Sequence, residues 1–391
     1  MEKTNLPDYH GGSIVNLMCS ILRELGTPGP RSDYPPLTGL EAGELGRSRH
    51  LVVLVIDGLG YGYLLGRHPS SHLGARVRQR LTSVFPSTTA SAVTTFLTGT
   101  APQQHAVTGW FGWFRELGVV AATLPFRVRA GGASLGAMGV TPRSVFDQPS
   151  VFERIDRRSH ILLPREFVDS DYTCVHAGPA ERHGYASLSS LFERLYTLLR
   201  SVRDPAYIYA YWPELDALAH AHGVGSAAVA EHFEALDAGF ADLVRALAGT
   251  DTTIIATADH GFIDTSPETV LELADHPVLS QTLRMPLCGE PRVAYCYVSP
   301  RARGQFERYV GERLGEQAQL YASEDLLNQG FFGHGEPHPR LRDRIGDYAL
   351  IMKERYVIRD VIPGEQPPAH VGVHGGLSED EMYVPLIVAQ T

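Results

Sequence analysis

Cysteine is scarce in this sequence: among 391 residues there are only four, at Cys19, Cys174, Cys288 and Cys296. No two of them form a Cys-x-x-Cys pair, so a structural zinc site built on thiolates is not expected. The sequence also lacks an apolar run of about 18 residues, and its N-terminal segment has no long apolar stretch. We therefore expect no membrane span and no signal peptide, and the expected location is the cytoplasm.

Basic residues are in the minority, with 34 Lys and Arg against 44 Asp and Glu and a net charge of −10. A protein that binds a nucleic-acid duplex needs a basic patch, so such a partner is not expected. A small phosphoester substrate, including a nucleotide, is compatible with this charge because bound metal ions can supply local positive charge. Nothing in the sequence indicates a particular oligomeric state.

Apolar and branched segments recur along the chain and alternate with helical patterns, as expected of strands and helices in an α/β protein. Helices are expected over about 227–247 and 303–314. Strands are expected over His50–Asp57, Leu81–Phe85, Ala206–Tyr211, Thr252–Thr257, Arg292–Val298 and Val384–Ala389. This order predicts a doubly wound, mostly parallel sheet with helices on both faces.

The pattern weakens in two places. Between about 109 and 205 Gly and Arg are common, and we expect a cap or insertion over the sheet. A second irregular stretch, about 324–344, is rich in Gly, His and Pro. The composition is that of an ordinary globular protein, so we expect residues 1–391 to form a single catalytic domain with these two insertions.

Acidic and imidazole side chains follow the expected strands. Because sites in open parallel sheets form outside the carboxyl ends of the strands, all of these side chains should reach one edge of the sheet. Asp216 and His220 are four residues apart, so one helical turn places both on the same face. The set consists of Asp57, Asp216, His220, Asp259, His260 and His374.

Three carboxylates and three imidazoles are enough to hold two divalent metal ions with three protein ligands each. Thr89 adds a hydroxyl at the start of an expected helix. There the helix dipole and unpaired N–H groups favour an alkoxide and a bound phosphate. A hydroxyl needs activation to become a nucleophile, and a metal ion provides it.

These segments resemble the type I phosphodiesterase/nucleotide pyrophosphatase family of the alkaline phosphatase superfamily. They occur in the family's order and cover most of the chain. The matching segments are Val55-Ile-Asp57-Gly58, Phe85-Pro-Ser-Thr-Thr89 running to Thr98-Gly99, Asp216-x-x-x-His220, Thr257-Ala-Asp259-His260-Gly261 and His374-Gly375-Gly376.

The resemblance implies an alkaline-phosphatase-like fold and hydrolysis of phosphodiester or nucleotide pyrophosphate bonds. It implies a first metal held by Asp57, Thr89, Asp259 and His260, and a second metal held by Asp216, His220 and His374. Thr89 would attack phosphorus and form a covalent phosphothreonine, which water then hydrolyses. Zinc is the family's usual metal, and Mn²⁺ is the alternative because nitrogen and oxygen ligands accept several metals.

Several alternatives stay open at this stage. Any of Ser87, Thr88 and Thr89 can be the N-cap of the helix without a catalytic role, and the family resemblance selects Thr89 over Thr88 as the nucleophile. His222 and His370 compete with His220 and His374 as ligands. Trp110, with its aromatic neighbours after the nucleophile helix, is either core or a stacking surface.

The chemistry also has alternatives. A phosphomonoesterase or phosphonate hydrolase fits the same scaffold, because Ala92, three residues after Thr89, has no polar group to contact a phosphate. A metal-bound sensor without turnover is a third hypothesis. Gly132–Gly136 matches the G-x-S-x-G pattern of serine hydrolases, but it lacks the expected strand and helix around it, so we expect a loop there.

Overall fold

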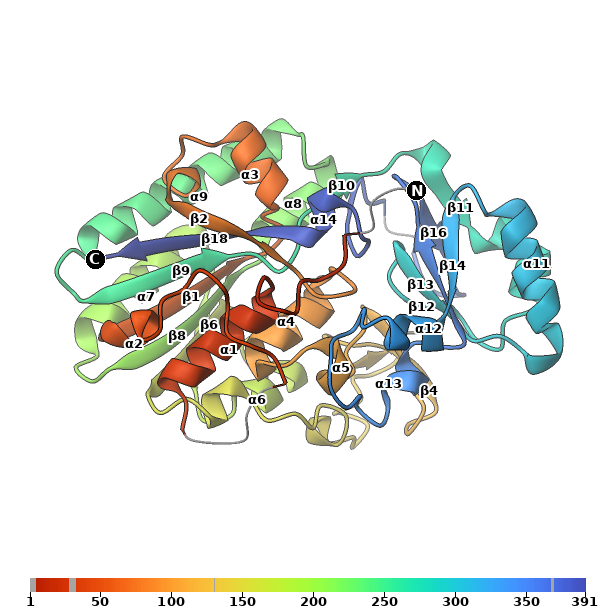
Figure 1. Ribbon diagram of the computed structural model, residues 1–391, viewed down its shortest axis with the longest axis horizontal. Helices are drawn as coiled ribbons and strands as arrows, with labels where there is room; N and C mark the ends of the chain where they lie inside the picture. The colour runs from red at the N-terminus through yellow and green to blue at the C-terminus, as the bar shows by residue number, and fades with distance from the viewer. Residues whose placement is uncertain (1–4, 28–32, 130, 367–368) are drawn as a thin grey trace.

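Two sheets lie side by side in the computed structural model, which describes residues 5–27, 33–129, 131–366 and 369–391 (Figure 1). The central sheet has seven strands, in the order β2 (Val77–Thr82), β18 (Tyr383–Gln390), β9 (Thr252–Thr257), β1 (His50–Ile56), β8 (Ala206–Trp212), β6 (Arg158–Pro164) and β7 (Glu181–Tyr185).

The strands from β9 to β7 are parallel to one another, and β18 is antiparallel to both of its neighbours. The inner strands β1, β8 and β9 are buried along their whole length. Continuous branched and aromatic runs are what a parallel strand covered on both faces requires. The expectation of an α/β fold with a mostly parallel sheet is confirmed.

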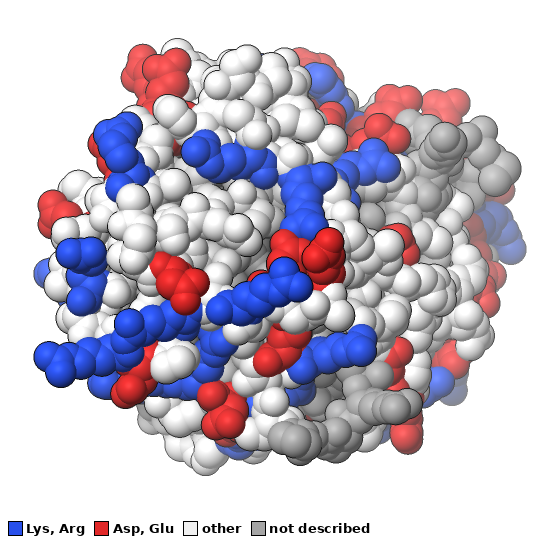
Figure 2. All heavy atoms as spheres, turned by 60° about the vertical axis from the view of Figure 1, so that its left-hand side comes forward, with Lys and Arg blue, Asp and Glu red and all other residues white. Residues whose placement is uncertain are grey.

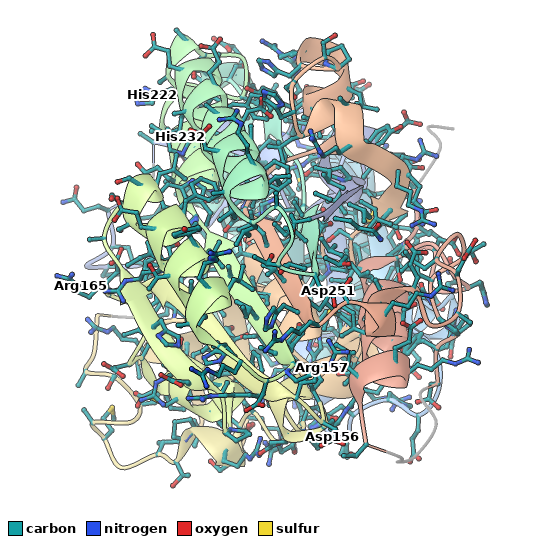
Figure 3. The ribbon with its side chains drawn as sticks, turned by 90° about the vertical axis from the view of Figure 1, so that its left-hand side faces the viewer. Asp156, Arg157, Arg165, His222, His232 and Asp251 are labelled. Carbon is teal, nitrogen blue, oxygen red and sulfur yellow. The ribbon has the colours of Figure 1, made fainter. Side chains whose placement is uncertain are left out.

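Helices cover both faces of the central sheet. One face is covered by α7 (Leu188–Ser201) and α9 (Ala227–Ala246), which lie side by side (Figure 3). The opposite face is covered by α1 (Ile14–Leu25), α4 (Thr89–Thr98) and α6 (Asp171–Ala177). Further helices are α2 (Glu44–Arg47), α3 (Tyr61–Arg67), α5 (Pro102–His105) and α8 (Glu214–His222).

The second sheet also has seven strands and is antiparallel throughout. Its order is β14 (Ala318–Ala322), β15 (Tyr348–Met352), β13 (Val293–Cys296), β12 (Cys288–Gly289), β3 (Phe111–Phe114), β4 (Val119–Ala122) and β5 (Arg127–Val128). Two-stranded pairs join β10 (Ile263–Asp264) to β17 (Gly372–Val373) and β11 (Val270–Glu272) to β16 (Val357–Arg359). The helices here are α10 (Pro277–Ser280), α11 (Arg303–Arg313), α12 (Ser323–Asn328), α13 (Leu341–Arg344) and α14 (Glu379–Met382).

The expected insertion over 109–205 is wrong in its extent. Residues 111–128 form three strands of the second sheet, while 158–205 return to the central sheet as β6, α6, β7 and α7. β7 is an edge strand with polar residues on its exposed positions, so it lacks the apolar run that marks the inner strands. The second irregular stretch, 324–344, contains α12 and α13, with irregular chain between them.

Two strand predictions also change. The segment expected at Arg292–Val298 forms β13, but in the second sheet and not in the central one. The strand expected at Leu81–Phe85 begins earlier, at Val77, and ends at Thr82. Its first half alternates between exposed and half-buried positions, so it has no apolar run that would reveal its start. None of the helices in the described part of the chain is long and apolar enough to cross a membrane.

Candidate metal centre and its cleft

The carboxyl ends of β1 and β9 place three of the expected residues together. Asp57 directly follows β1, and Asp259 and His260 follow β9, its parallel neighbour. All three side chains are buried. Oδ1 of Asp259 accepts hydrogen bonds from the backbone N–H of Gly58 at 3.1 Å and of His260 at 3.0 Å, so each strand end fixes the other.

The first cluster consists of Asp57, Asp259, His260 and Thr89. Nε2 of His260 lies 3.4 Å from Asp57 Oδ1, 3.4 Å from Asp259 Oδ2 and 3.1 Å from Thr89 Oγ1. The Tyr211 hydroxyl donates to Asp57 Oδ2 and turns the other oxygen of that carboxylate toward the cluster.

The second cluster consists of Asp216, His220 and His374. Asp216 and His220 share one face of α8, and His374 follows β17. Nε2 of His220 lies 3.5 Å from Asp216 Oδ1 and 3.2 Å from Nε2 of His374, and the latter is 3.7 Å from the same carboxylate oxygen. The rings of His260 and His374 stack with centroids 3.6 Å apart, so the two clusters adjoin.

Both clusters fit a metal ion by spacing. Two donor atoms that bind one Zn²⁺ tetrahedrally at about 2.0–2.1 Å lie roughly 3.3–3.4 Å apart. The separations from the imidazole nitrogens to the other donor atoms run from 3.1 to 3.7 Å. Three buried oxygens also have no hydrogen-bond partner, although buried polar atoms normally have one. They are Asp57 Oδ1, Asp259 Oδ2 and Asp216 Oδ1, the oxygens that face the clusters.

Two of the three imidazoles, His220 and His260, are oriented as metal ligands are. Nδ1–H of His260 donates to the carbonyl oxygen of Gly261 at 3.1 Å, and Nδ1–H of His220 donates to that of Gly372 at 2.8 Å. In each ring the proton therefore sits on Nδ1, and the Nε2 lone pair points into the cluster. Burial lowers the pKa of His220 to about 3, which keeps the ring neutral and able to bind a cation.

The negative charges of the buried carboxylates need a positive charge nearby. Burial, and then repulsion from Asp216 and Asp259, raises the pKa of Asp57. Burial, and then repulsion from Asp259 and Glu290, raises the pKa of Asp216. Close, buried negative charges are stable only when a positive charge is placed among them, and divalent cations supply it.

Thr89 occupies the first position of α4, the end of the helix that carries positive partial charge. It is half-buried, whereas Ser87 and Thr88 are buried and bonded elsewhere. Thr88 Oγ1 donates to Glu290 at 2.7 Å, and Ser87 Oγ donates to the Gly376 carbonyl at 2.7 Å. Of the three adjacent hydroxyls, only that of Thr89 contacts the first cluster.

The competing histidines lie outside both clusters. His222 is exposed and sits on the outer surface in Figure 3. His370 is also exposed and stacks on the ring of His220, with centroids 4.2 Å apart. Ala92 is fully buried within α4 and belongs to the main hydrophobic core.

The clusters open into a cleft of about 530 Å³ between the two sheets. Trp110 is part of its wall and 38% exposed, which favours a surface for substrate over a place in the core. The sequence analysis missed Glu290, Arg129 and Arg359, which also line the cleft. Glu290 and Arg129 follow short strands of the second sheet, and Arg359 ends β16 of a two-stranded pair, so no local pattern distinguishes them from surface charges.

A third group with ligand-like spacing lies on β6 and β7: His160, Glu181 and His183. Unlike the carboxylates of the two clusters, its carboxylate already has a cationic partner, because Arg158 Nη2 lies 2.9 Å from Glu181 Oε2, and Glu181 is exposed to solvent. On the face seen in Figure 2, basic and acidic side chains are intermixed. We assign no metal to this group.

Comparisons with known proteins identify the family and the fold. The sequence model of the family "type I phosphodiesterase / nucleotide pyrophosphatase" matches residues 51–377. Among solved structures, murine ectonucleotide pyrophosphatase / phosphodiesterase 5 superposes with a TM-score of 0.63 at 18% identity, covering 87% of each chain. Phosphonoacetate hydrolase from Sinorhizobium meliloti, in complex with phosphonoformate, superposes with a TM-score of 0.61 at 16% identity, covering 93% of each chain. No match was found among curated protein sequences.

Proposed function

The chain belongs to the type I phosphodiesterase / nucleotide pyrophosphatase family and is a hydrolase of phosphoester bonds, and on this basis we propose that it cleaves phosphodiesters through a phosphothreonine at Thr89. The observation that carries the proposal is the position of the Thr89 hydroxyl, 3.1 Å from Nε2 of His260, at the edge of two clusters with metal-ligand spacing. A sensor without turnover would not need a hydroxyl placed there.

Asp57, Thr89, Asp259 and His260 would hold one divalent ion, and Asp216, His220 and His374 would hold the other. Zinc suits this donor set, and Mn²⁺ is the alternative. When bound, the two ions would make the Thr89 oxygen more nucleophilic and neutralise charge on the phosphoryl oxygens. The family depends on metal ions for its chemistry, which is consistent with both clusters being filled.

The residues of the chain divide the remaining work. Thr89 Oγ1 attacks phosphorus, so an O–P bond forms while the bond to the departing ester oxygen breaks. The proton of the Thr89 hydroxyl passes to the departing alcohol or to solvent. The first turn of α4 directs its N–H groups toward the phosphoryl oxygens and favours their negative charge. Water then attacks the phosphothreonine and restores the Thr89 hydroxyl.

The test compares bis(4-nitrophenyl) phosphate with 4-nitrophenyl phosphate as substrates, in the wild type and in Thr89→Ala. We expect the diester to be the better substrate, and Thr89→Ala to lose nearly all activity while keeping most of its metal. Thr100→Ala, beyond the other end of the same helix, is the matched control and should keep wild-type activity. Unchanged turnover in Thr89→Ala would refute the nucleophile, and a much faster monoester would refute the diesterase assignment.

Phosphonate hydrolysis is the second candidate, supported by the family-level chemistry and the likeness to phosphonoacetate hydrolase. It requires the same nucleophile and the same clusters but a different group in the cleft. Release of phosphate from phosphonoacetate, measured beside the two nitrophenyl substrates, decides between them.

A further inference from the structure

Both arginines that line the cleft already bind a carboxylate. Arg129 makes a two-point ion pair with Glu365, with Nε–Oε1 at 2.9 Å and Nη2–Oε2 at 3.0 Å. It also donates to the backbone carbonyl of Leu287 at 2.7 Å and stacks over the Phe111 ring. Its side chain is only 5% exposed, so it is a structural link and not an open anion site.

Arg359 is held in the same way. It pairs with Glu272 across the short parallel ladder of β11 and β16, with Nε–Oε1 at 3.0 Å. Two arginines bound to two carboxylates leave no net positive charge on these walls. A second phosphate or a carboxylate on the substrate would have to compete with Glu272 and Glu365 for them.

Outside the second cluster, the remaining acidic groups on the cleft walls are Glu290 and Asp360. Burial raises the pKa of Glu290 to about 7, so its carboxyl is negative above that pH. Glu290 is 9% exposed, and its Oε1 accepts from Thr88 Oγ1 and from Trp110 N–H, both at 2.7 Å. These contacts fix the carboxylate one residue away from the nucleophile. Asp360 stands on another part of the wall and accepts from the Leu287 N–H at 2.8 Å. Among the described residues, no Lys or Arg forms an ion pair with the carboxylate of Glu290 or Asp360.

Apolar side chains make up most of the rest of the wall. Trp110 and Val361 stand at exposed positions, 38% and 41%, and Phe111, Leu287 and Ile358 lie deeper. Apolar surface next to uncompensated carboxylates favours an uncharged or cationic group and disfavours an anion.

We propose that this cleft accepts phosphodiesters whose second ester group carries no negative charge, and that Glu290 is the residue that rejects anionic groups. The inference rests on the proposed diesterase function and narrows its substrate class. With this preference the protein differs from enzymes whose substrates carry a carboxylate or a second phosphate next to the reacting phosphorus.

The experiment uses three 4-nitrophenyl phosphodiesters that share the leaving group and differ only in the second ester: propyl, 3-aminopropyl and 2-carboxyethyl. For the metal-loaded wild type, assayed at about pH 8.5, above the pKa of Glu290, we expect kcat/KM for the propyl ester to exceed that for the carboxyethyl ester by about tenfold or more, because like charges at short range repel strongly. The aminopropyl ester should equal or exceed the propyl ester.

Glu290→Gln keeps the acceptor oxygen for Thr88 and Trp110 but removes the charge. In this variant the ratio of propyl to carboxyethyl should fall by about tenfold, back toward equality. Glu324→Gln, an exposed glutamate on α12, is the matched control and should keep the wild-type ratio. Asp360→Asn removes the other wall carboxylate and should also lower the ratio of propyl to carboxyethyl, so it tests the charge selection if Glu290→Gln folds poorly.

The outcomes separate the two proposals. If the wild type hydrolyses none of the three esters, the diesterase function fails. If all three are hydrolysed but the carboxyethyl ester is as good as the propyl ester, only the charge selection is wrong. If Glu290→Gln folds and keeps the full wild-type ratio, the assignment to Glu290 is overturned.

Discussion

Arg292 and Glu381 form a two-point ion pair in the interior, with Nε–Oε1 and Nη2–Oε2 both at 3.0 Å. Their exposures are 1% and 0%. Glu381 Oε1 also accepts from the Gly376 N–H at 2.8 Å, and its backbone carbonyl accepts from the Gly261 N–H at 2.9 Å. One buried pair therefore fixes the segments that directly follow His260 and His374.

Breaking this pair should destabilise the whole protein. Glu381→Gln leaves the Arg292 guanidinium buried without a full counter-charge, and we expect the free energy of unfolding to fall by about 3–5 kcal/mol. The measurement is urea or guanidinium unfolding. Glu324→Gln, which breaks the exposed pair with Arg342, is the control and should cost less than about 1 kcal/mol. Equal effects of the two substitutions would contradict a stabilising role for the buried pair.

The two clusters should bind their ions separately. Asp57→Asn removes a charged ligand from the first cluster, and Asp216→Asn removes one from the second. Each variant should keep about one metal ion per chain where the wild type keeps about two, because a neutral amide binds Zn²⁺ far more weakly than a carboxylate. Metal analysis after dialysis checks this. Wild-type metal content in either variant would remove that aspartate from the ligand set.

The sequence placed the parts of the site that follow strand ends. Asp57 and Asp259 each stand directly after a continuous apolar strand, and parallel strands bring their carboxyl ends to one edge. Asp216 and His220 need only one helical turn to share a face. For these residues local periodicity and topology determine position, so reasoning from the sequence reaches them.

The residues on the other wall of the cleft cannot be identified from the sequence in this way. Glu290 lies in the turn after β12, a strand of two residues, and Arg129 follows β5, also of two residues. Strands this short have no measurable periodicity, and their place in the second sheet depends on pairing between segments far apart in the chain. The sequence predicts one insertion over 109–205 for a different reason. In its second half, β6 has only three consecutive apolar residues, Ile161–Leu163, and the edge strand β7 is polar, although both belong to the central sheet.

Trp110 should contribute to binding of aromatic esters. Its ring is 38% exposed on the wall of the cleft, next to the nucleophile helix. Trp110→Ala should raise KM for bis(4-nitrophenyl) phosphate by about tenfold through lost stacking and buried area, with a smaller change for a diester with two small alkyl groups. Tyr196→Ala, which removes an exposed aromatic ring on α7, is the control and should leave both KM values unchanged. Equal changes for both substrates would argue against stacking.

A buried histidine away from the clusters should make stability depend on pH. His176 on α6 is 2% exposed, and its Nδ1–H donates to the Tyr172 carbonyl at 2.8 Å. Burial is the main cause that lowers the pKa of His176 to about 4. An unfolded histidine takes up a proton near pH 6.5, so between that pH and 4 the unfolded state binds a proton that the folded state does not.

The stabilisation from keeping His176 neutral is therefore complete above about pH 6.5 and is lost as the pH falls toward 4, by on the order of 3 kcal/mol over that range. His176→Gln cannot take up this proton. The variant should be less stable than the wild type at pH 7, because the packing of the ring is lost, but the difference should shrink steadily as the pH falls. Unfolding in urea at several pH values measures it. His222→Gln, at an exposed position, is the control and should follow the wild-type curve. A constant difference between His176→Gln and the wild type from pH 7 to 4 would mean that His176 takes up its proton equally well in the folded and unfolded states.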